Sequence, residues 1–269
     1  MLTTYLGVAG WPVGHSRSPA MHNAALTAVG LADWRYLRLP LPPARFAETV
    51  RALPGAGFRG INVTIPHKEA ALALATSATE TARAVGAANT LTFGADGGIH
   101  ADNTDVPGLL AVLPVDPAGA TALVLGAGGA ARAAVHALRT AGAADVQVWN
   151  RSPARGARLV AELGGRAVAV PRGADIVVNC TAVGLSDGDD PFKTLPLQAD
   201  TVGVGSCVVD MVYRPGGTRL LAEAKRQGAE VVDGLEILVA QGAVSFARWT
   251  DRTAPRDVMR QAVADVAAP

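Results

Sequence analysis

Several features that would point to a secreted, membrane or metal-binding protein are missing from this chain. Two cysteines in 269 residues do not make a disulfide framework, and Cys180 and Cys207 lack the spacing of a metal site. No apolar run approaches the roughly 18 residues that a membrane span needs, and Met1 to Thr4 do not begin a secretion signal. A formal net charge of +1 gives no reason to expect nucleic acid or an anionic membrane surface as partner. We therefore expect a cytoplasmic protein without a metal ion.

Lysine is also scarce. The chain has three lysines, Lys68, Lys193 and Lys225, against 21 arginines. Arginine stays protonated at any ordinary pH, whereas a lysine in a pocket can shift its pKa and exchange a proton. Lys68 follows two apparent turn residues, so proton chemistry is one explanation for a lysine there. Surface solvation is the ordinary role of a lysine, and composition alone does not decide between the two.

Residues 120–155 have the pattern of a dinucleotide-binding unit. An apolar strand is expected at 121–125, followed by a G-x-G-x-x-A turn from Gly126 to Ala131 and an alanine-rich helix to about Ala141. Gly126 permits the tight turn, Gly128 lets the backbone approach a pyrophosphate, and Ala131 lets the helix pack on the strand. Free N–H groups at the helix start attract phosphate. The cofactor-binding residues predicted here are Gly126, Ala127, Gly128, Gly129 and Ala130.

The acid that usually marks an NAD site is missing from the end of the next strand. Val146 to Trp149 leads into Asn150-Arg151-Ser152, with Arg155 close behind. An Asp or Glu near this point would bond the ribose 2′-hydroxyl of NAD. Two guanidiniums and a hydroxyl suit a 2′-phosphate better, because arginine binds phosphate through a bidentate fork. We predict NADP as cofactor, held by Asn150, Arg151, Ser152 and Arg155; a solvated basic helix start is the alternative.

Strand-like and helix-like segments alternate along the chain, which predicts an α/β fold with largely parallel sheets. In the first part, strands are expected at 5–9, 35–41, 60–65, 90–93 and 98–101, and helices at 19–29, 43–53 and 68–75. Further on, strands are expected at 174–179, 208–212 and 230–232, a loop at 187–191, and helices at 217–227, 235–249 and 255–267. We predict an N-terminal α/β substrate-binding domain (1–103, with the C-terminal helices in 237–269) and a Rossmann-type dinucleotide-binding domain (104–236). The active site is expected in the cleft between them.

Three polar clusters fall at predicted strand ends or adjoining turns, where α/β domains usually bind ligands. The first contains Ser16 and Ser18, which could cap the following helix or hold a carboxylate. In the second, Asn62 and Thr64 share one face of a strand, which Pro66 ends just before Lys68. Capping of the strand end is the alternative for these two residues. The third cluster combines residues 86–90 with residues 102–105.

These motifs, taken in order, resemble those of the shikimate dehydrogenases. The segments S-x-S-P-x-x-H-N (16–23), N-V-T-I-P-H-K-E (62–69), G-A-A-N-T (86–90) and D-N-T-D (102–105) are similar to the substrate-domain motifs of that family. G-A-G-G-A-A-R (126–132) and N-R-S-x-x-R (150–155) are similar to its NADP site, and residues 234–241 to its closing substrate motif. Two departures are Ile237, where methionine is frequent, and residues 180–184, which vary the loop on the nicotinamide side.

The resemblance implies reversible NADPH-dependent reduction of 3-dehydroshikimate to shikimate, a step toward chorismate and the aromatic amino acids. Lys68 and Asp105 would be the catalytic pair. The Lys68 ammonium would stabilise and protonate the alkoxide that forms at the ketone oxygen, and Asp105 would orient Lys68.

The same likeness assigns further residues. The carboxylate would be held by Ser16 and Ser18, with Tyr213 approaching from the other domain. Ring hydroxyls would be bound by Asn62, Thr64, Asn89 and Gln241. The cofactor site would also include Thr181, Val183, Met211 and Gly234. His15, His22 and His67 are expected to be structural, because Lys68 already supplies the proton.

Two alternatives fit parts of the pattern. A quinate/shikimate dehydrogenase using NAD would carry an acid in place of Arg151. A non-catalytic NADP-binding regulator on the same scaffold should have lost Lys68 or Asp105, and both are present. The expected partner is a small-molecule substrate, with neither nucleic acid nor membrane, and the enzyme is expected to be a monomer or a homodimer.

Overall fold

The computed structural model describes residues 3–186, 188–198, 202–214 and 216–264. It divides into two compact units. The first comprises the described residues up to Gly108 together with those from Leu238 onward, and the second is Leu109–Ile237. Both boundaries fall inside helices, α5 (Asp105–Leu110) and α10 (Gly234–Thr250).

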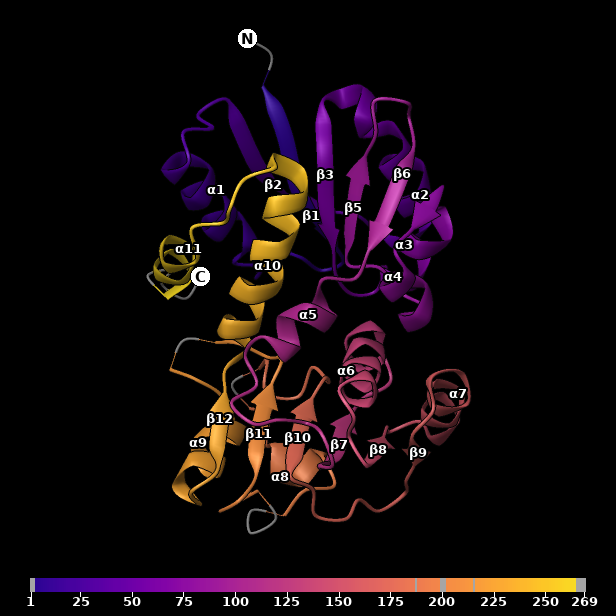
Figure 1. The fold of residues 1–269 in the computed structure, drawn as a ribbon, viewed down its shortest axis with the longest axis vertical. Coiled ribbons are helices and arrows are strands. Elements are labelled where there is room, and N and C mark those ends of the chain that lie inside the picture. Colours follow the sequence, from indigo (N-terminus) through magenta and orange to yellow (C-terminus); the bar gives the residue numbers. More distant parts are fainter. Residues whose placement is uncertain (1–2, 187, 199–201, 215, 265–269) are drawn as a thin grey trace. The chain divides into compact units, whose positions relative to one another are not determined.

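The first unit is built around a six-stranded sheet in the order β2-β1-β3-β5-β6-β4 (Figure 1). Its strands are β1 (Thr4–Gly10), β2 (Trp34–Pro40), β3 (Phe58–Val63), β4 (Ser77–Ala78), β5 (Thr90–Phe93) and β6 (Ile99–Asp102). Three of the five strand pairings are parallel, whereas β5 runs antiparallel to both of its neighbours. The Gly94 N–H donates to the Gly98 carbonyl, and so short a connection joins only antiparallel strands.

Helices cover both faces of this sheet. They are α1 (Ser18–Ala28), α2 (Pro43–Ala52), α3 (Lys68–Leu74), α4 (Glu80–Val85), α10 and α11 (Arg256–Ala264), with a short 3₁₀ turn at Pro54–Ala56. On one face, Ile61 and Val63 of β3 pack with Phe46 and Val50 of α2. Asn62 points to the opposite face, as the two-residue period of a strand requires.

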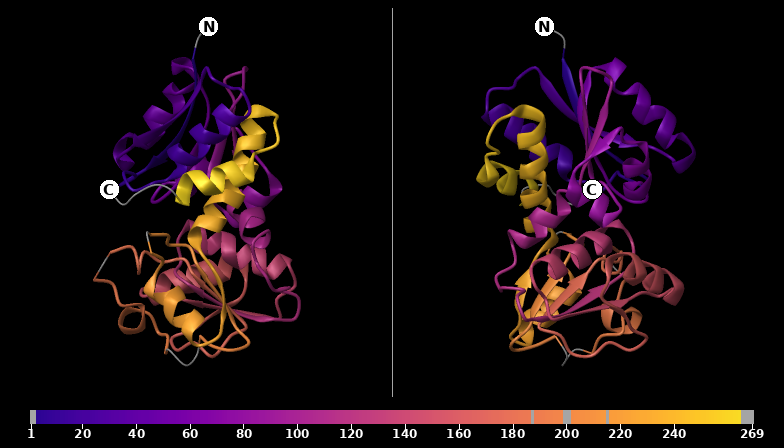
Figure 2. Two further views of the ribbon diagram at one scale, coloured as in Figure 1. Left: turned by 90° about the vertical axis from the view of Figure 1, so that its left-hand side faces the viewer. Right: turned by 45° about the vertical axis from the view of Figure 1, so that its right-hand side comes forward.

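The C-terminal helices pack against the first unit although they come last in the chain (Figure 2), and Ser245 of α10 contacts the Asn62 side chain. Trp249 of α10 donates its indole N–H to the Leu91 carbonyl of β5 at 3.1 Å. Arg17, buried just before α1, donates to the Val263 carbonyl of α11 at 2.6 Å. The last helix was predicted over 255–267, of which the residues beyond 264 lie outside the described part.

One helix start differs from the sequence-based expectation. Ser18 was expected to cap the helix that follows it, but it is the first residue of α1. The N-cap is Arg17, and no side chain caps the helix there. The Ser16 hydroxyl instead accepts the backbone N–H of Ser18 at 3.3 Å, a local serine turn. The hydroxyl of Ser18 is therefore not used as a cap.

The second unit holds a fully parallel sheet in the order β12-β11-β10-β7-β8-β9. Its strands are β7 (Thr121–Leu125), β8 (Asp145–Trp149), β9 (Arg166–Ala167), β10 (Ile176–Asn179), β11 (Cys207–Asp210) and β12 (Glu230–Val232). Numbered within the unit, this is the strand order of a Rossmann fold. The order reverses between β7 and β10, and ligands of such sheets bind at that switch point.

Helix α6 (Gly129–Thr140) packs with β7 and β8, α7 (Pro153–Leu163) with β8 and β9, and α9 (Arg219–Arg226) with β11 and β12. The central strands β7, β10 and β11 are buried on both faces and are nearly continuous apolar runs, as in other parallel sheets. The predicted loop at 187–191 leads into a short helix, α8 (Pro191–Thr194), which Asp190 caps by accepting the Phe192 N–H. Asp187 lies outside the described residues.

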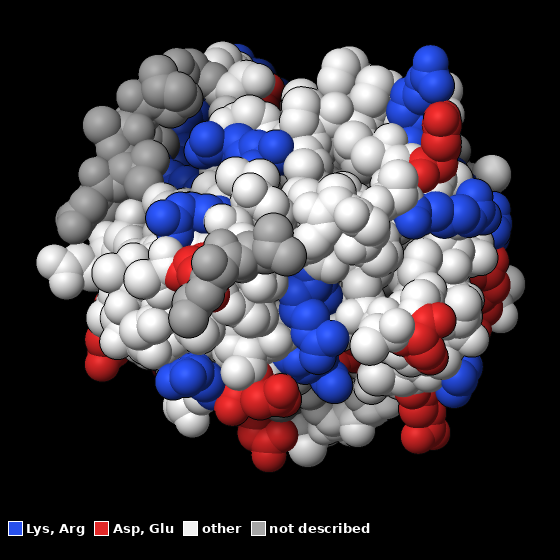
Figure 3. Space-filling view, turned by 90° about the horizontal axis from the view of Figure 1, so that it is seen from above, with Lys and Arg blue, Asp and Glu red and all other residues white. Residues whose placement is uncertain are grey.

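On the face shown in Figure 3, basic and acidic side chains are interspersed among uncharged ones. No helix in the described part of the chain is both long and apolar enough to cross a membrane. Within the same residues, no three His, Cys, Asp or Glu side chains come together in a way that could hold a metal ion.

Candidate active site

Lys68 and Asp105 form a close pair in the first unit. Lys68 begins α3 directly after the turn that follows β3, and Asp105 begins α5. The Lys68 Nζ lies 2.5 Å from Asp105 Oδ2, and only 13% and 11% of these side chains are exposed. The second carboxylate oxygen, Oδ1, accepts a hydrogen bond from Asn89 Nδ2 at 2.8 Å. Lys68 is therefore not a solvated surface lysine, which answers the question that composition left open.

Asn89 connects this pair to the C-terminal helix. Besides Asp105, its Nδ2 lies 3.0 Å from Thr104 Oγ1 and 3.3 Å from Gln241 Oε1 of α10. Its Oδ1 accepts the Thr104 N–H at 2.7 Å. Gln241, which lies 152 positions from Asn89 in the chain, thus contacts the same amide group as Thr104 and Asp105. These partners orient the oxygen and the nitrogen of the Asn89 amide.

Asn62 joins the same hydrogen-bonded group from β3. Its Nδ2 donates to Ser245 Oγ at 2.9 Å, and its Oδ1 accepts the Tyr36 hydroxyl at 2.8 Å. Thr64, two residues on, is half-buried, and its backbone N–H donates to the Ala9 carbonyl at 2.9 Å. Asn62 is thus more than a strand-end cap, because it contacts side chains from β2 and α10.

Of the two serines of the first motif, Ser16 lies in the loop after β1 and Ser18 is the first residue of α1. Ser16 and Ser18 are both buried, with their hydroxyl oxygens 3.2 Å apart. Arg38 of β2 donates to the Ser16 carbonyl at 2.8 Å. The Trp11 N–H donates to the Ile65 carbonyl at 3.0 Å, so the loops after β1 and β3 lie side by side. The serines and Lys68 therefore lie in, or directly after, adjacent loops at one end of the sheet.

His22 and His67 have environments that favour the neutral imidazole. His22 is fully buried and stacked on Tyr36, and burial lowers its pKa to about 3. Burial also lowers the pKa of His67, whose Nε2 lies 2.7 Å from the Leu41 carbonyl oxygen and whose ring stacks on Phe46. His15 is exposed. Structural roles for His22 and His67 agree with this geometry.

In the second unit, the glycine turn follows β7 at the switch point of the sheet. Gly126 has φ +112°, which favours glycine, and a Cβ there would stand 3.2 Å from the backbone of Cys180. No described atom lies within 4 Å of where a Cβ of Gly128 would stand. Helix α6 begins at Gly129 without a side-chain cap, so its first N–H groups are available to a phosphate. Ala127 and Ala130 belong to this same turn and first helical residues.

The basic segment after β8 also suits a phosphate. Asn150 Nδ2 donates to the Ser152 carbonyl at 2.9 Å and shapes the turn into α7. Arg151, Ser152 and Arg155 are exposed. Toward described residues, neither Arg151 nor Arg155 forms an ion pair, whereas Arg158 on the same helix pairs with Glu162. The open turn, the uncapped helix and the two arginines fit a dinucleotide with a 2′-phosphate.

A buried polar cluster orders the loops after β10 and β11. Asn179 accepts the Thr181 hydroxyl at 2.7 Å and donates to the Val183 carbonyl at 3.1 Å. Asp210 accepts from Asn179, the Val212 N–H and the Thr218 hydroxyl at 2.7–3.0 Å. Burial raises the pKa of Asp210 to about 6, against the effect of these three donors.

The remaining predicted residues of the second unit lie beside this cluster. Met211 follows Asp210 directly, and a Cβ on Gly234 would stand 2.8 Å from the Met211 carbonyl oxygen. Tyr213 is half-buried in the same loop. Its contact with a substrate carboxylate stays a prediction, as does an active site between the domains.

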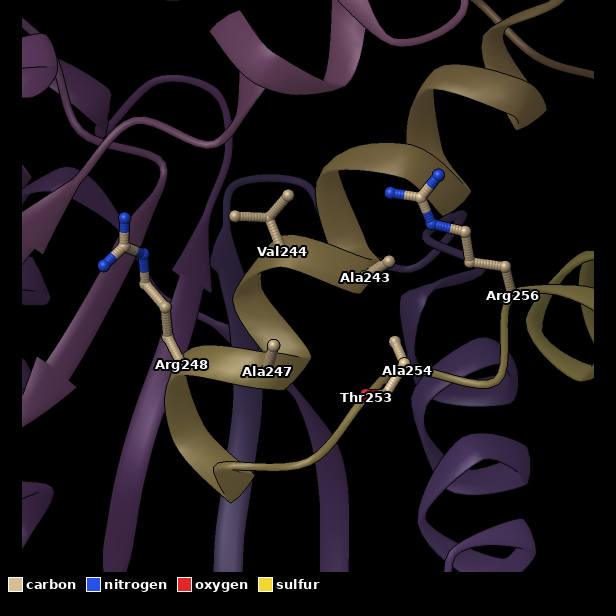
Figure 4. A pocket seen from close by; sticks show the side chains of 7 residues that line it. All are labelled: Ala243, Val244, Ala247, Arg248, Thr253, Ala254 and Arg256. Carbon is tan, nitrogen blue, oxygen red and sulfur yellow. The ribbon is translucent and has the colours of Figure 1, made fainter.

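A groove of about 510 Å³ lies elsewhere in the first unit, between α10 and the segment that enters α11. Figure 4 shows Ala243, Ala247 and Ala254 in it, with Arg248 and Arg256 extending to opposite sides. Arg248 pairs with Asp102. The groove contains none of the predicted site residues.

Three family models match successive parts of the chain. Residues 8–91 match the shikimate dehydrogenase substrate binding domain, residues 112–183 the shikimate / quinate 5-dehydrogenase model, and residues 234–264 the shikimate 5'-dehydrogenase C-terminal domain. A shikimate dehydrogenase (NADP(+)) of Paracoccus denitrificans is 45% identical over 96% of this chain and 94% of its own length. The chain belongs to the shikimate dehydrogenase family.

Solved structures agree with this assignment. The shikimate 5-dehydrogenase of Thermus thermophilus, in complex with NADP(H) and shikimate, is 41% identical, with a TM-score of 0.87 over 97% of this chain and 98% of that one. A ligand-free 5-ketofructose reductase of Gluconobacter is 30% identical, with a TM-score of 0.84 over 97% of this chain and 98% of that one. The same fold therefore occurs in proteins named for different substrates, shikimate and 5-ketofructose.

Four residues of the site were not predicted to have a role of their own. Tyr36, Thr90, Thr104 and Ser245 contact the predicted residues through side-chain hydrogen bonds. Thr90 and Thr104 stand inside motifs already noted. Ser245 lies four residues after Gln241, on the same face of a helix, which is a usable signal. The sequence has no comparable signal for Tyr36.

Proposed function

We propose that this enzyme catalyses the reversible NADPH-dependent reduction of 3-dehydroshikimate to shikimate. The observation that carries the proposal is the Lys68–Asp105 pair, with Nζ and Oδ2 2.5 Å apart among buried amides. Membership of the family and the NADP-dependent naming of its relatives support the same activity.

Substrate binding would use the polar groups of the first unit. The adjacent hydroxyls of Ser16 and Ser18 would hold the carboxylate, and the Arg38 guanidinium bound to the Ser16 carbonyl adds positive charge nearby. Asn62, Thr64, Asn89 and Gln241 would bind the ring hydroxyls. Amides suit this work, because each has both donors and acceptors and can distinguish one hydroxyl pattern from another.

Lys68 would act at the carbonyl oxygen. When a ketone carbon accepts a hydride, negative charge develops on its oxygen, and a fixed ammonium stabilises that charge and supplies a proton. Asp105 would orient the Lys68 amine toward the carbonyl oxygen, since Asn89 holds the other oxygen of its carboxylate. In the reverse direction, Lys68 would remove the proton from the substrate hydroxyl.

The second unit would hold NADPH, which supplies the hydride when bound. Gly126, Ala127, Gly128, Gly129 and Ala130 would leave room for the pyrophosphate and offer it N–H groups. Asn150, Arg151, Ser152 and Arg155 would bind the 2′-phosphate. Thr181, Val183, Met211 and Gly234 would surround the nicotinamide. Tyr213 would reach the substrate carboxylate.

The test is a matrix of initial rates with purified protein. Shikimate, quinate and 5-ketofructose are each offered with NADP(H) or NAD(H), in the direction that the substrate requires. We expect shikimate with NADP to have the highest kcat/KM. A higher value for quinate with NAD, or for 5-ketofructose, would contradict the proposal.

Lys68→Ala tests the mechanism separately. The substitution should lower kcat by about 10²-fold or more, as for other acid–base groups, with little change in KM. Circular dichroism checks that the variant is folded. Normal turnover in a folded Lys68→Ala protein would remove Lys68 from the mechanism and favour a non-catalytic role for the pair. A cytoplasmic location and a monomeric or homodimeric state stay predictions.

A further inference from the structure

Asn62 is held from both sides by hydroxyl groups with no assigned role. Tyr36 of β2 donates to Oδ1 at 2.8 Å, and Ser245 of α10 accepts from Nδ2 at 2.9 Å. Both of these residues are buried: Tyr36 is 1% exposed and Ser245 is fully buried. Asn62 itself is 6% exposed, so its contacts leave it little freedom to turn.

The orientation of the Asn62 amide is determined by a neighbouring group that can only accept a hydrogen bond. The Asn89 carbonyl lies 3.3 Å from Asn62 Nδ2, and a carbonyl oxygen can only accept. A flipped amide would therefore place two oxygens against each other. Ser245 donates its own proton to the Gln241 carbonyl at 3.1 Å, which leaves its oxygen to accept from Asn62.

The same serine hydroxyl contacts other parts of the site. Its oxygen lies 3.1 Å from Thr90 Oγ1 and 3.2 Å from Thr104 Oγ1. Thr104 in turn contacts Asn89, which holds Asp105. Ser245 therefore connects helix α10 to the strand that carries Asn62 and to the loop that precedes Asp105.

We propose that Tyr36 and Ser245 are positioning residues for substrate binding, which fix the Asn62 amide between β2 and α10 so that it meets a ring hydroxyl. This inference rests on the proposed function. It concerns residues that would act through Asn62 and would not themselves touch the substrate. Their effect should therefore fall on KM for shikimate more than on kcat, because the orientation of a binding group is lost and not the acid.

Tyr36→Phe and Ser245→Ala test the proposal with little change in packing. The first keeps the ring that stacks on His22 at 4.3 Å and removes only the hydroxyl. Each variant should raise KM for shikimate by roughly 5- to 20-fold, as expected for one buried hydrogen bond, with kcat within about 3-fold and KM for NADP unchanged. Thr250→Val is the matched control. It removes a similar side-chain-to-backbone hydrogen bond on the same helix, from Thr250 Oγ1 to the Phe246 carbonyl at 2.8 Å. KM for shikimate and kcat should both stay as in wild type.

A double-mutant cycle separates positioning from a general effect on stability. In an Asn62→Ala background, adding Tyr36→Phe or Ser245→Ala should not raise KM further, because the group that they orient is gone. Equal increases in both backgrounds, or a lower melting temperature with unchanged KM, would overturn the proposal. If wild type oxidises shikimate and both variants have the same KM as wild type, the positioning roles are wrong and the proposed function is unaffected. Wild type that neither binds nor oxidises shikimate overturns the proposed function and these roles with it.

Discussion

Replacing His22 with leucine should make the first unit less sensitive to acid. The imidazole is fully buried, and neither ring nitrogen meets the geometry of a hydrogen bond with a described residue. Burial lowers its pKa from 6.5 to about 3, while the nearby Asn62 side chain acts against this shift. Leucine suits the same apolar site and does not titrate.

The magnitude follows from the two pKa values. The unfolded chain protonates this histidine near pH 6.5, whereas the native protein does so only near pH 3. Because the native pKa is the lower one, the stability that His22 contributes is complete above about pH 6.5 and is lost as the pH falls toward 3. On going from pH 7 to pH 5, binding of this proton to the unfolded chain lowers the free energy of unfolding by about 2 kcal/mol. That is a large share of a typical stability of about 5–15 kcal/mol.

Urea unfolding at pH 7 and pH 5, followed by tryptophan emission, measures the effect. The ring of Trp249 lies 5.7 Å from that of His22, so the emission reports on this core. On going from pH 7 to pH 5, the free energy of unfolding of His22→Leu should rise by about 2 kcal/mol relative to that of wild type. The contributions of titrating groups that both proteins share cancel in this difference. Met21→Leu, a buried neighbour that does not titrate, should differ from wild type equally at both pH values. If His22→Leu also differs equally at both, the histidine is not held neutral and the reasoning is wrong.

Three further predictions concern binding and pH. Ser16→Ala with Ser18→Ala should raise KM for shikimate more than it lowers kcat, because binding common to ground and transition states is lost; normal binding in a protein that melts early would assign them a structural role. Arg151→Ala should weaken NADP by about 10²-fold and leave NAD nearly unchanged, and high salt should erode NADP binding more than NAD binding; equal kcat/KM of wild type for both cofactors would refute the NADP assignment. Asp210 has its pKa raised by burial to about 6, so the stability that it contributes is complete below about pH 4 and lost as the pH rises through 6. From pH 5 to pH 7, the free energy of unfolding of Asp210→Asn, measured with urea, should therefore rise by about 1 kcal/mol relative to that of wild type. The same difference between the two proteins at both pH values would contradict the raised pKa.

The elements that sequence patterns predicted best are those determined by neighbouring residues. The structure has β7 at Thr121–Leu125 and β12 at Glu230–Val232, the ranges expected from their apolar runs. The glycine turn after β7 was also predictable, because its first position has a positive φ, +112° at Gly126, which glycine adopts without strain. The two-residue strands β4 and β9 were not predicted, since two residues show no periodicity. Helix α7 was anticipated only as the alternative of a basic helix start, without bounds, although Pro153 in its first turn is a usual start signal.

The residues of the site likewise fall into two groups, those that short sequence motifs identify and those that only tertiary contacts reveal. The sequence determined by itself that Lys68, Asp105, Asn62 and Asn89 stand in motifs similar to those of the family, since each motif is a short local pattern. Only the tertiary structure decided that Asn62 donates to Ser245, 183 residues away, and that Tyr36 holds its other end. Such contacts depend on how α10 packs on the sheet, and no spacing along the chain records that packing. The same holds for the low pKa of His22 and the raised pKa of Asp210, because desolvation depends on everything that surrounds a group and not on its neighbours in sequence.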